Sequence, residues 1–166
     1  MIFCGKAGGS FMFMSQYEHS IDAKGRTVIP SEFRDELGDS FVMTVGIDGC
    51  TYIYSMNEWE NFEKKLHSIS MNTRENRMIK RAFLGQSKVL VPDKQGRIVV
   101  PQNLRKVGGF KDELVFVGIG DKIEVWDKER YEKVNAIPFD DFGFSEGEVM
   151  NKSMSEMMSS VSGEII

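Results

Sequence analysis

Histidine and cysteine are scarce in this sequence, with two residues of each among 166. Cys4, Cys50, His19 and His67 do not cluster, whereas a structural zinc site needs four such ligands close together and a disulfide framework needs paired spacings. His19 stands three residues before Asp22, but one such pair at the border of a strand and a turn is a weak metal signal. A partly buried strand residue is the favoured interpretation, and we expect no metal and no cofactor.

Long apolar runs and catalytic motifs are absent as well. No stretch approaches the run of about 18 apolar residues that spans a membrane. The sequence contains neither a Gly-x-x-x-x-Gly-Lys phosphate loop nor a Gly-x-Gly-x-x-Gly fingerprint. An enzyme acting on a cell-wall or nucleotide substrate would need a nucleophile or a metal set, and neither is visible. We therefore expect no catalysis, no small-molecule substrate and no membrane partner, and the few cysteines favour a reducing cytoplasm.

Charge is unevenly distributed along the chain, although the formal net charge is only −4. The stretch 64–106 holds eleven Lys or Arg residues and two acids, a local net charge of +9. Residues 138–166 hold six acids and one Lys, a local net charge of −5. A basic segment followed by an acidic tail is typical of a polyanion-binding surface, and it also occurs on ordinary solvated helices.

One phrase, Asp-x-x-Gly-Arg-x-x-x-Pro, is present twice, at 22–30 and at 93–101. The similarity between the copies continues downstream with a one-residue insertion, so that 16–58 and 87–130 form a tandem repeat. Each copy is expected to contain a strand, the Asp-Gly turn, a second strand ending at Pro, a short helix and a hairpin. Neither copy is long enough to bury its own apolar face, which predicts one pseudo-twofold barrel with a shared core.

Further helices are expected in addition to the short helix of each copy. Asn57 and Glu60 are expected to form a capping pair at the start of one helix, and Asp127 to cap the last one. A helix over 73–84 is expected to carry basic residues on one face and an apolar stripe on the other. The stripe consists of Met78, Ile79, Ala82 and Phe83.

The predicted organisation has five parts. Residues 1–15 are an extension that is not native or is disordered, 16–58 and 87–130 are the two repeats, 59–86 is a basic helical linker, and 131–166 is the end of a helix followed by an acidic flexible tail. Because Lys-Ala-Gly-Gly-Ser resembles a translated ribosome-binding site, Met12 is the expected native start, with Met14 as the alternative. A native flexible arm is the remaining interpretation of residues 1–11.

The two Asp-x-x-Gly-Arg turns are the candidate functional site. Pseudo-twofold symmetry would place Arg26 and Arg97 side by side. Asp22 and Asp93 would then hold each guanidinium in a fixed orientation toward a phosphate or a guanine edge.

Other residues of the motif have supporting roles in this interpretation. Gly25 and Gly96 would supply the positive φ of each turn. A purely structural role of the motif is the alternative, in which each arginine is only a solvated or Asp-paired residue. In the functional interpretation, further cations widen the positive face for phosphate contacts: Lys24, Arg34, Lys94, Arg105 and Lys106.

Four phrases of this sequence carry a resemblance to a known family. They are Tyr17-Glu-His-Ser-Ile-Asp-Ala-Lys-Gly-Arg26, Tyr54-Ser-Met-Asn-Glu-Trp59, Asp93-Lys-Gln-Gly-Arg97 and Val117-Gly-Ile-Gly-Asp-Lys-Ile-Glu-Val-Trp-Asp127. From Met12 to about Val134 the sequence resembles the MraZ family of bacterial transcriptional regulators, which contain two SpoVT/AbrB-type repeats. It departs from the family in the eleven-residue front extension and in Pro92, which replaces an apolar residue and predicts that the strand before it ends early.

The resemblance implies both a fold and a function. The implied fold is α+β, mainly β with short helices, in which two SpoVT/AbrB-like repeats form a swapped-hairpin barrel and the chains form a ring-shaped homo-oligomer. The implied function is binding to short direct repeats in double-stranded promoter DNA upstream of the division and cell-wall gene cluster, in the cytoplasm and associated with the nucleoid. Arg26 and Arg97 would be the DNA-contacting residues. A rival interpretation is an AbrB-type antitoxin-like interaction module with weak DNA binding, but such modules usually carry a single repeat.

Overall fold

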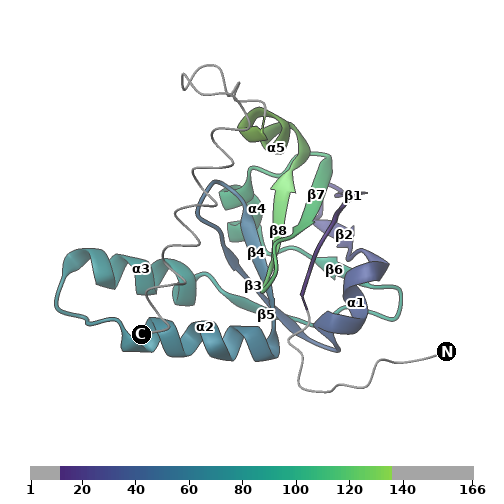
Figure 1. Cartoon of the computed structure of the whole chain (residues 1–166). Helices are drawn as coiled ribbons and strands as arrows, with labels where there is room; N and C mark the ends of the chain where they lie inside the picture. Colours follow the sequence, from purple (N-terminus) through teal and green to yellow (C-terminus); the bar gives the residue numbers. More distant parts are fainter. Residues whose placement is uncertain (1–11, 136–166) are drawn as a thin grey trace, which may run out of the picture. The chain divides into compact units, whose positions relative to one another are not determined.

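The computed structural model of the protein describes residues 12–135, and Figure 1 labels its helices and strands. Strands and helices follow the same order in both halves of the chain, and the predicted combination of sheet with short helices is confirmed. The elements are β1 (Gln16–Ser20), β2 (Arg26–Val28), α1 (Ser31–Leu37), β3 (Phe41–Val45), β4 (Thr51–Ser55), α2 (Met56–Ser68), α3 (Arg74–Gly85), β5 (Lys88–Leu90), β6 (Arg97–Val99), α4 (Gln102–Gly108), β7 (Glu113–Gly118), β8 (Ile123–Asp127) and α5 (Lys128–Asn135).

The two repeats share one antiparallel sheet with the strand order β1-β7-β8-β4-β3-β5. β1 belongs to the first repeat but pairs with β7 of the second, so that Gln16 lies opposite Val117. β5 belongs to the second repeat but pairs with β3 of the first, so that Leu90 lies opposite Phe41. Reversing the strand order exchanges the equivalent strands of the two repeats, which gives the sheet its pseudo-twofold symmetry.

The predicted barrel is not confirmed in its closed form. Within residues 12–135, the six-stranded sheet ends at β1 and β5, which do not pair with each other, and β2 pairs with β6 in a separate two-stranded ribbon. The exchange of first strands between the repeats is present, but the sheet does not close on itself.

The core occupies both faces of the sheet, because successive strand residues point to opposite sides. On one face, Phe41 and Met43 are fully buried in a cluster that also includes Leu104 from α4. On the other face, Tyr54 packs with Trp59 of α2 at a ring-centroid distance of 5.7 Å. Burial of one such side chain contributes about 1.5–3 kcal/mol. Since the first cluster draws its residues from both repeats, neither repeat has a core of its own.

α2 and α3 lie side by side against the second face (Figure 1). Phe62 and Phe83 join them with a ring-centroid distance of 5.1 Å, and Thr44 Oγ1 donates a hydrogen bond to the carbonyl of Phe83 at 2.8 Å. The predicted apolar stripe of α3 is only partly covered, because Met78 and Ile79 remain 53% and 40% exposed. No helix within residues 12–135 combines the length and the apolar character needed to cross a membrane.

Helix capping agrees with the sequence prediction at α5 and differs from it at α2. Asp127 Oδ2 accepts a hydrogen bond from the N–H of Arg130 at 3.3 Å, as predicted. At α2, Ser55 Oγ accepts from the N–H of Glu58 at 3.2 Å, so the predicted capping pair at Asn57 is wrong. The helix starts directly after β4, and the last strand residue is already a good cap, so Asn57 falls inside the first turn.

Two further observations concern the limits of the strands, one a confirmation and one a difference. β5 spans three residues and β1 spans five, which confirms that the strand before Pro92 ends early. Proline has no N–H to donate to a neighbouring strand. Phe13 is buried, and its N–H donates to the carbonyl of Gly120 at 2.8 Å, so the chain contacts the core before the predicted start of the first repeat at 16. Residues 1–11 and 136–166 lie outside the described residues, and the expectations for them stay predictions.

Candidate nucleic-acid interface

The two Asp-x-x-Gly-Arg turns have the same backbone geometry. The N–H of Gly25 donates to the carbonyl of Asp22 at 3.0 Å, and the N–H of Gly96 donates to that of Asp93 at 2.9 Å. The φ angles of the two glycines are +84° and +78°, which other residues adopt only with strain. Each turn therefore depends on glycine at its fourth position and leads directly into β2 or β6.

The ribbon formed by β2 and β6 carries both arginines on one face. Arg26 lies opposite Val99, and Arg97 lies opposite Val28. Residues opposite each other in an antiparallel pair share a face, as do alternate residues along a strand, so these four point to the same side. The two arginine side chains are 60% and 62% exposed, whereas Thr27 on the other side of the ribbon is buried. The ribbon thus presents two cations and two valines outward.

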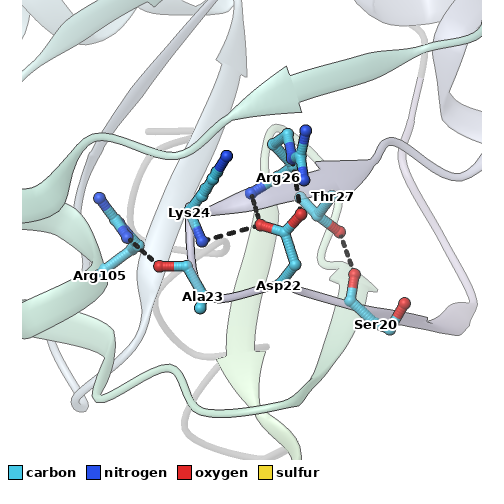
Figure 2. A network of polar contacts seen from close by, with 7 residues as sticks. All are labelled: Ser20, Asp22, Ala23, Lys24, Arg26, Thr27 and Arg105. Atoms are coloured by element: carbon cyan, nitrogen blue, oxygen red, sulfur yellow. Dashed lines mark hydrogen bonds and ion pairs between the residues drawn. The ribbon is translucent and has the colours of Figure 1, made fainter.

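The carboxylate of Asp22 fixes the orientation of Arg26 (Figure 2). Its Oδ1 accepts hydrogen bonds from the N–H groups of Lys24 and Arg26, both at 2.9 Å, and its Oδ2 accepts from the Nε of Arg26 at 2.6 Å. The backbone N–H of Arg26, followed by its side chain, lowers the pKa of Asp22 below its ordinary value, so the carboxylate is ionised at neutral pH. The ion pair with Asp22 occupies the Nε of Arg26. Its two terminal amino groups make no hydrogen bond or ion pair within residues 12–135 and can donate to an acceptor outside the protein.

The second turn repeats this geometry with one addition. Asp93 Oδ1 accepts from the N–H groups of Gln95 and Arg97 at 2.9 Å, and its Oδ2 accepts from the Nε of Arg97 at 2.6 Å. Gln95 Oε1 also accepts from the Nη2 of Arg97 at 3.4 Å. In the first turn, the residue equivalent to Gln95 is Lys24. The lysine of the second turn, Lys94, stands one position before Gln95. Both lysines are exposed. Gln95 was missed in the sequence analysis because the additional site residues were selected by their positive charge and Gln95 is neutral.

The structure places the guanidinium groups of Arg34 and Arg105 in contact with the turns. Both side chains belong to half-buried residues, on α1 and α4. Arg105 Nη1 donates to the carbonyl of Ala23 at 3.3 Å, as Figure 2 shows, and Arg34 Nε donates to the carbonyl of Ile29 at 2.9 Å. Lys106, the remaining predicted cation, is exposed.

The other residues that drew attention in the sequence have structural surroundings. His19 is a partly buried strand residue whose ring packs edge-on against Phe116 with centroids 6.1 Å apart, as predicted. Cys50 is buried, and burial, followed by the charge of Glu124, raises the pKa of its thiol to about 12. Within residues 12–135, no three or more His, Cys, Asp or Glu side chains are grouped in a way that could hold a metal ion.

Comparison with known proteins agrees with the doubled arrangement. A family model described as "MraZ protein, putative antitoxin-like" matches residues 12–82 and 83–143, and each stretch contains one Asp-x-x-Gly-Arg turn. The transcriptional regulator MraZ of Lachnoclostridium phytofermentans is 49% identical over 121 residues, covering 73% of this chain and 85% of that protein. Proteins of the same name from Acetivibrio thermocellus and Clostridium tetani are 44% and 41% identical, over 73% and 75% of this chain and 85% and 87% of theirs. This chain therefore belongs to the MraZ family.

Proposed function

We propose that this protein is a sequence-specific DNA-binding transcriptional regulator that reads double-stranded DNA with the β2–β6 ribbon. The observation that carries the proposal is the placement of Arg26 and Arg97 on one exposed face, each oriented by a carboxylate. A two-stranded antiparallel ribbon fits the major groove, where an arginine can bind O6 and N7 of guanine together. Relatives that are 40–49% identical carry the name transcriptional regulator, which supports the same function.

The carboxylates suit this role because they fix the arginines in advance. An exposed ion pair contributes little to folding stability, so the bonds from Asp22 and Asp93 are better explained by orientation than by stability. A guanidinium that is already held loses less conformational freedom when it binds a base. Val28 and Val99 stand on the same face and would contact the methyl groups of thymine.

The surrounding cations would contact phosphates. Lys24 and Lys94 extend from the two turns and are exposed, as phosphate-contacting residues must be. Each neutralised phosphate contributes about −0.9 to the slope of log affinity against log salt concentration. Phosphate contacts hold the ribbon in register, and the two arginines supply the sequence preference.

We further propose the finer assignments that family membership suggests. The two repeats, 16–58 and 87–130, would be domains of the SpoVT/AbrB type joined by the basic linker 59–86, and the chains would assemble into a ring. The half-exposed apolar side chains of α3, Met78 and Ile79, support a contact with a further protein chain. The DNA targets would be short direct repeats upstream of the division and cell-wall gene cluster, bound in the cytoplasm at the nucleoid, without catalysis or cofactor.

A matched pair of double variants tests the DNA-binding face. Arg26→Ala with Arg97→Ala should abolish preference for the promoter duplex in a gel-shift competition, with the thermal unfolding midpoint unchanged. Arg74→Ala with Arg81→Ala removes the same charge from exposed positions of α3 and should preserve the preference. If instead the α3 pair loses discrimination and the ribbon pair keeps it, the interface lies on the helix and the assignment to the ribbon is wrong.

Duplexes with different repeat spacing test the multivalent part of the proposal. Once one chain of a ring is bound, the next binds at high effective concentration, so affinity should rise by roughly 10²–10⁴-fold from one repeat to two. The salt slope should steepen at the same time, and inserting about 5 bp, half a helical turn, should weaken binding. Fluorescence anisotropy with the three duplexes measures this. Equal affinities and equal slopes would show that each chain binds DNA singly.

A second candidate function is an antitoxin-like module whose main partner is another protein. The family description and the exposed apolar side chains on α3 favour this candidate. Substituting Met78 and Ile79 with Ser separates the two functions. In a DNA-binding regulator these changes act through assembly only, and binding to a single repeat should persist. In a protein-binding module, the substitutions at Met78 and Ile79 should abolish binding of the protein partner, whereas substitutions in the ribbon should not.

A further inference from the structure

We propose that Arg34 and Arg105 are positioning residues, each of which holds the recognition turn of the opposite repeat in place. Arg105 stands on α4 of the second repeat, yet its guanidinium lies over the turn of the first. Arg34 stands on α1 of the first repeat, yet its guanidinium lies over the turn of the second. This inference rests on the proposed DNA-binding function of the turns, and it reassigns two residues that the sequence predicted to contact phosphates.

The contacts on the first turn show how the bracing works. A Cβ built on Gly25 would lie 2.8 Å from the Nε of Arg105 and 2.9 Å from the carbonyl oxygen of Val100. The Nη1 of Arg105 donates to the carbonyl of Ala23 inside the turn at 3.3 Å, and the N–H of Val100 donates to the carbonyl of Gly25 at 2.8 Å. The second repeat therefore holds the first turn with one side chain and one backbone bond.

The second turn is held in the matching way. A Cβ on Gly96 would collide with the Nε of Arg34, and the N–H of Ile29 donates to the carbonyl of Gly96 at 2.8 Å. Arg34 in turn donates from its Nε to the carbonyl of Ile29 at 2.9 Å, which fixes its guanidinium against the glycine. Glycine is thus required at both positions for two reasons. The backbone has a positive φ, and a guanidinium from the other repeat occupies the space that a side chain would need.

The burial of Arg105 also favours a positioning role over a direct DNA contact. Its Nε is buried and has no hydrogen-bond partner among the described residues. Leaving a buried polar donor unpaired costs free energy, so packing against the turn must compensate for it. A residue that acted by reaching phosphates would gain from having its guanidinium in solvent. Here the buried edge faces the turn that orients Arg26.

Hydrogen–deuterium exchange of the free protein tests the bracing without DNA. Arg105→Ala should speed exchange in a peptide covering 22–26 by about tenfold, which corresponds to about 1.4 kcal/mol, and should leave 93–97 unchanged. Arg34→Ala should show the reverse pattern, and the control Lys106→Ala, an exposed neighbour with the same charge, should change neither. The inference would be overturned if each variant speeded exchange in the turn of its own repeat, if it speeded both turns equally, or if it changed neither turn.

Double-variant cycles on the promoter duplex test the consequence for binding. Arg105→Ala should add no further loss of affinity to Arg26→Ala, but its effect should add fully to that of Arg97→Ala, although Arg97 belongs to the same repeat. Arg105→Lys keeps the charge but lacks the planar group, so it should bind as weakly as Arg105→Ala. Full rescue by lysine, or additivity with both arginine variants, would mean a direct phosphate contact and refute the positioning role.

The two assays separate failure of this inference from failure of the proposed function. If Arg26→Ala and Arg97→Ala leave DNA binding intact, the proposed interface is wrong, while the exchange pattern still decides whether the cross-repeat bracing exists. If both arginine variants lose binding but exchange does not follow the crossed pattern, the interface stands and the bracing is wrong.

Discussion

Replacing Gly25 by alanine should destabilise the protein more than the same change at another glycine with positive φ. At Gly25, φ is +84°, and the new Cβ would lie 2.9 Å from the carbonyl oxygen of Val100 and 2.8 Å from the Nε of Arg105. The left-handed backbone costs roughly 1–2 kcal/mol for alanine, and forced overlap in a packed site costs roughly 1–3 kcal/mol more. We therefore expect a loss of about 2–5 kcal/mol in the free energy of unfolding.

Gly120 provides the matched control. Its φ is +99°, and a Cβ there would have no atom within 4 Å, so Gly120→Ala should cost only the backbone term of roughly 1–2 kcal/mol. Urea unfolding followed by tryptophan fluorescence, at one fixed protein concentration, measures both losses. Adding Arg105→Ala to Gly25→Ala should recover part of the lost stability, because it removes the overlap with the guanidinium. Recovery should be incomplete, because the overlap with the carbonyl of Val100 remains. Equal losses at the two glycines would refute the close approach of the second repeat to the first turn.

Three further measurements test particular contacts. The pKa of Asp22, read by carboxyl NMR, should stay below its ordinary value in Arg26→Gln but rise from the wild-type value, because the backbone N–H of residue 26 remains while the guanidinium is lost. Its stabilising contribution is present above the unfolded pKa and is lost as the pH falls through the folded one. Cys50, whose pKa is raised by burial to about 12, should be alkylated much more slowly than an exposed thiol at neutral pH, as peptide mass spectrometry would show; rapid modification would contradict its burial. Phe13→Ala should lower the free energy of unfolding by about 3 kcal/mol through loss of its contact with Phe33, whereas an unchanged urea midpoint would exclude that contact.

The repeat determined what could be predicted from the sequence. Recognition of the doubled Asp-x-x-Gly-Arg phrase gave the turns and the following strands, because these depend on glycine, proline and alternation within a few residues. The shared core followed from the shortness of each copy, which cannot bury an apolar face alone. The same local chemistry predicted the short β5 before Pro92 and the cap at Asp127. The error at α2 is of the same local kind, since Ser55 and Asn57 are equally good caps and only the end of β4 selects the first.

Individual side-chain contacts between the repeats escaped prediction because they depend on tertiary packing. Arg105 meets Ala23 across a separation of 82 residues, and its sequence neighbourhood is that of any surface cation. Charge alone therefore assigned Arg34 and Arg105 to a phosphate-binding face, and their close contact with the turns of the opposite repeat could not be predicted from the sequence. Likewise, the periodicity of α3 predicted an apolar stripe but not that Met78 would stay exposed.

The inequality between the two turns gives the ribbon a direction. A homodimer of identical turns would read DNA the same way from either end, because any substitution in one turn would appear in the other. Here one chain contains both turns, with Lys24 in one and Lys94 and Gln95 in the other, so each can change independently. A DNA-binding ribbon with two unlike turns distinguishes the two strands of its target duplex. On the function proposed above, its sites need no palindrome, and successive sites must point the same way along the promoter.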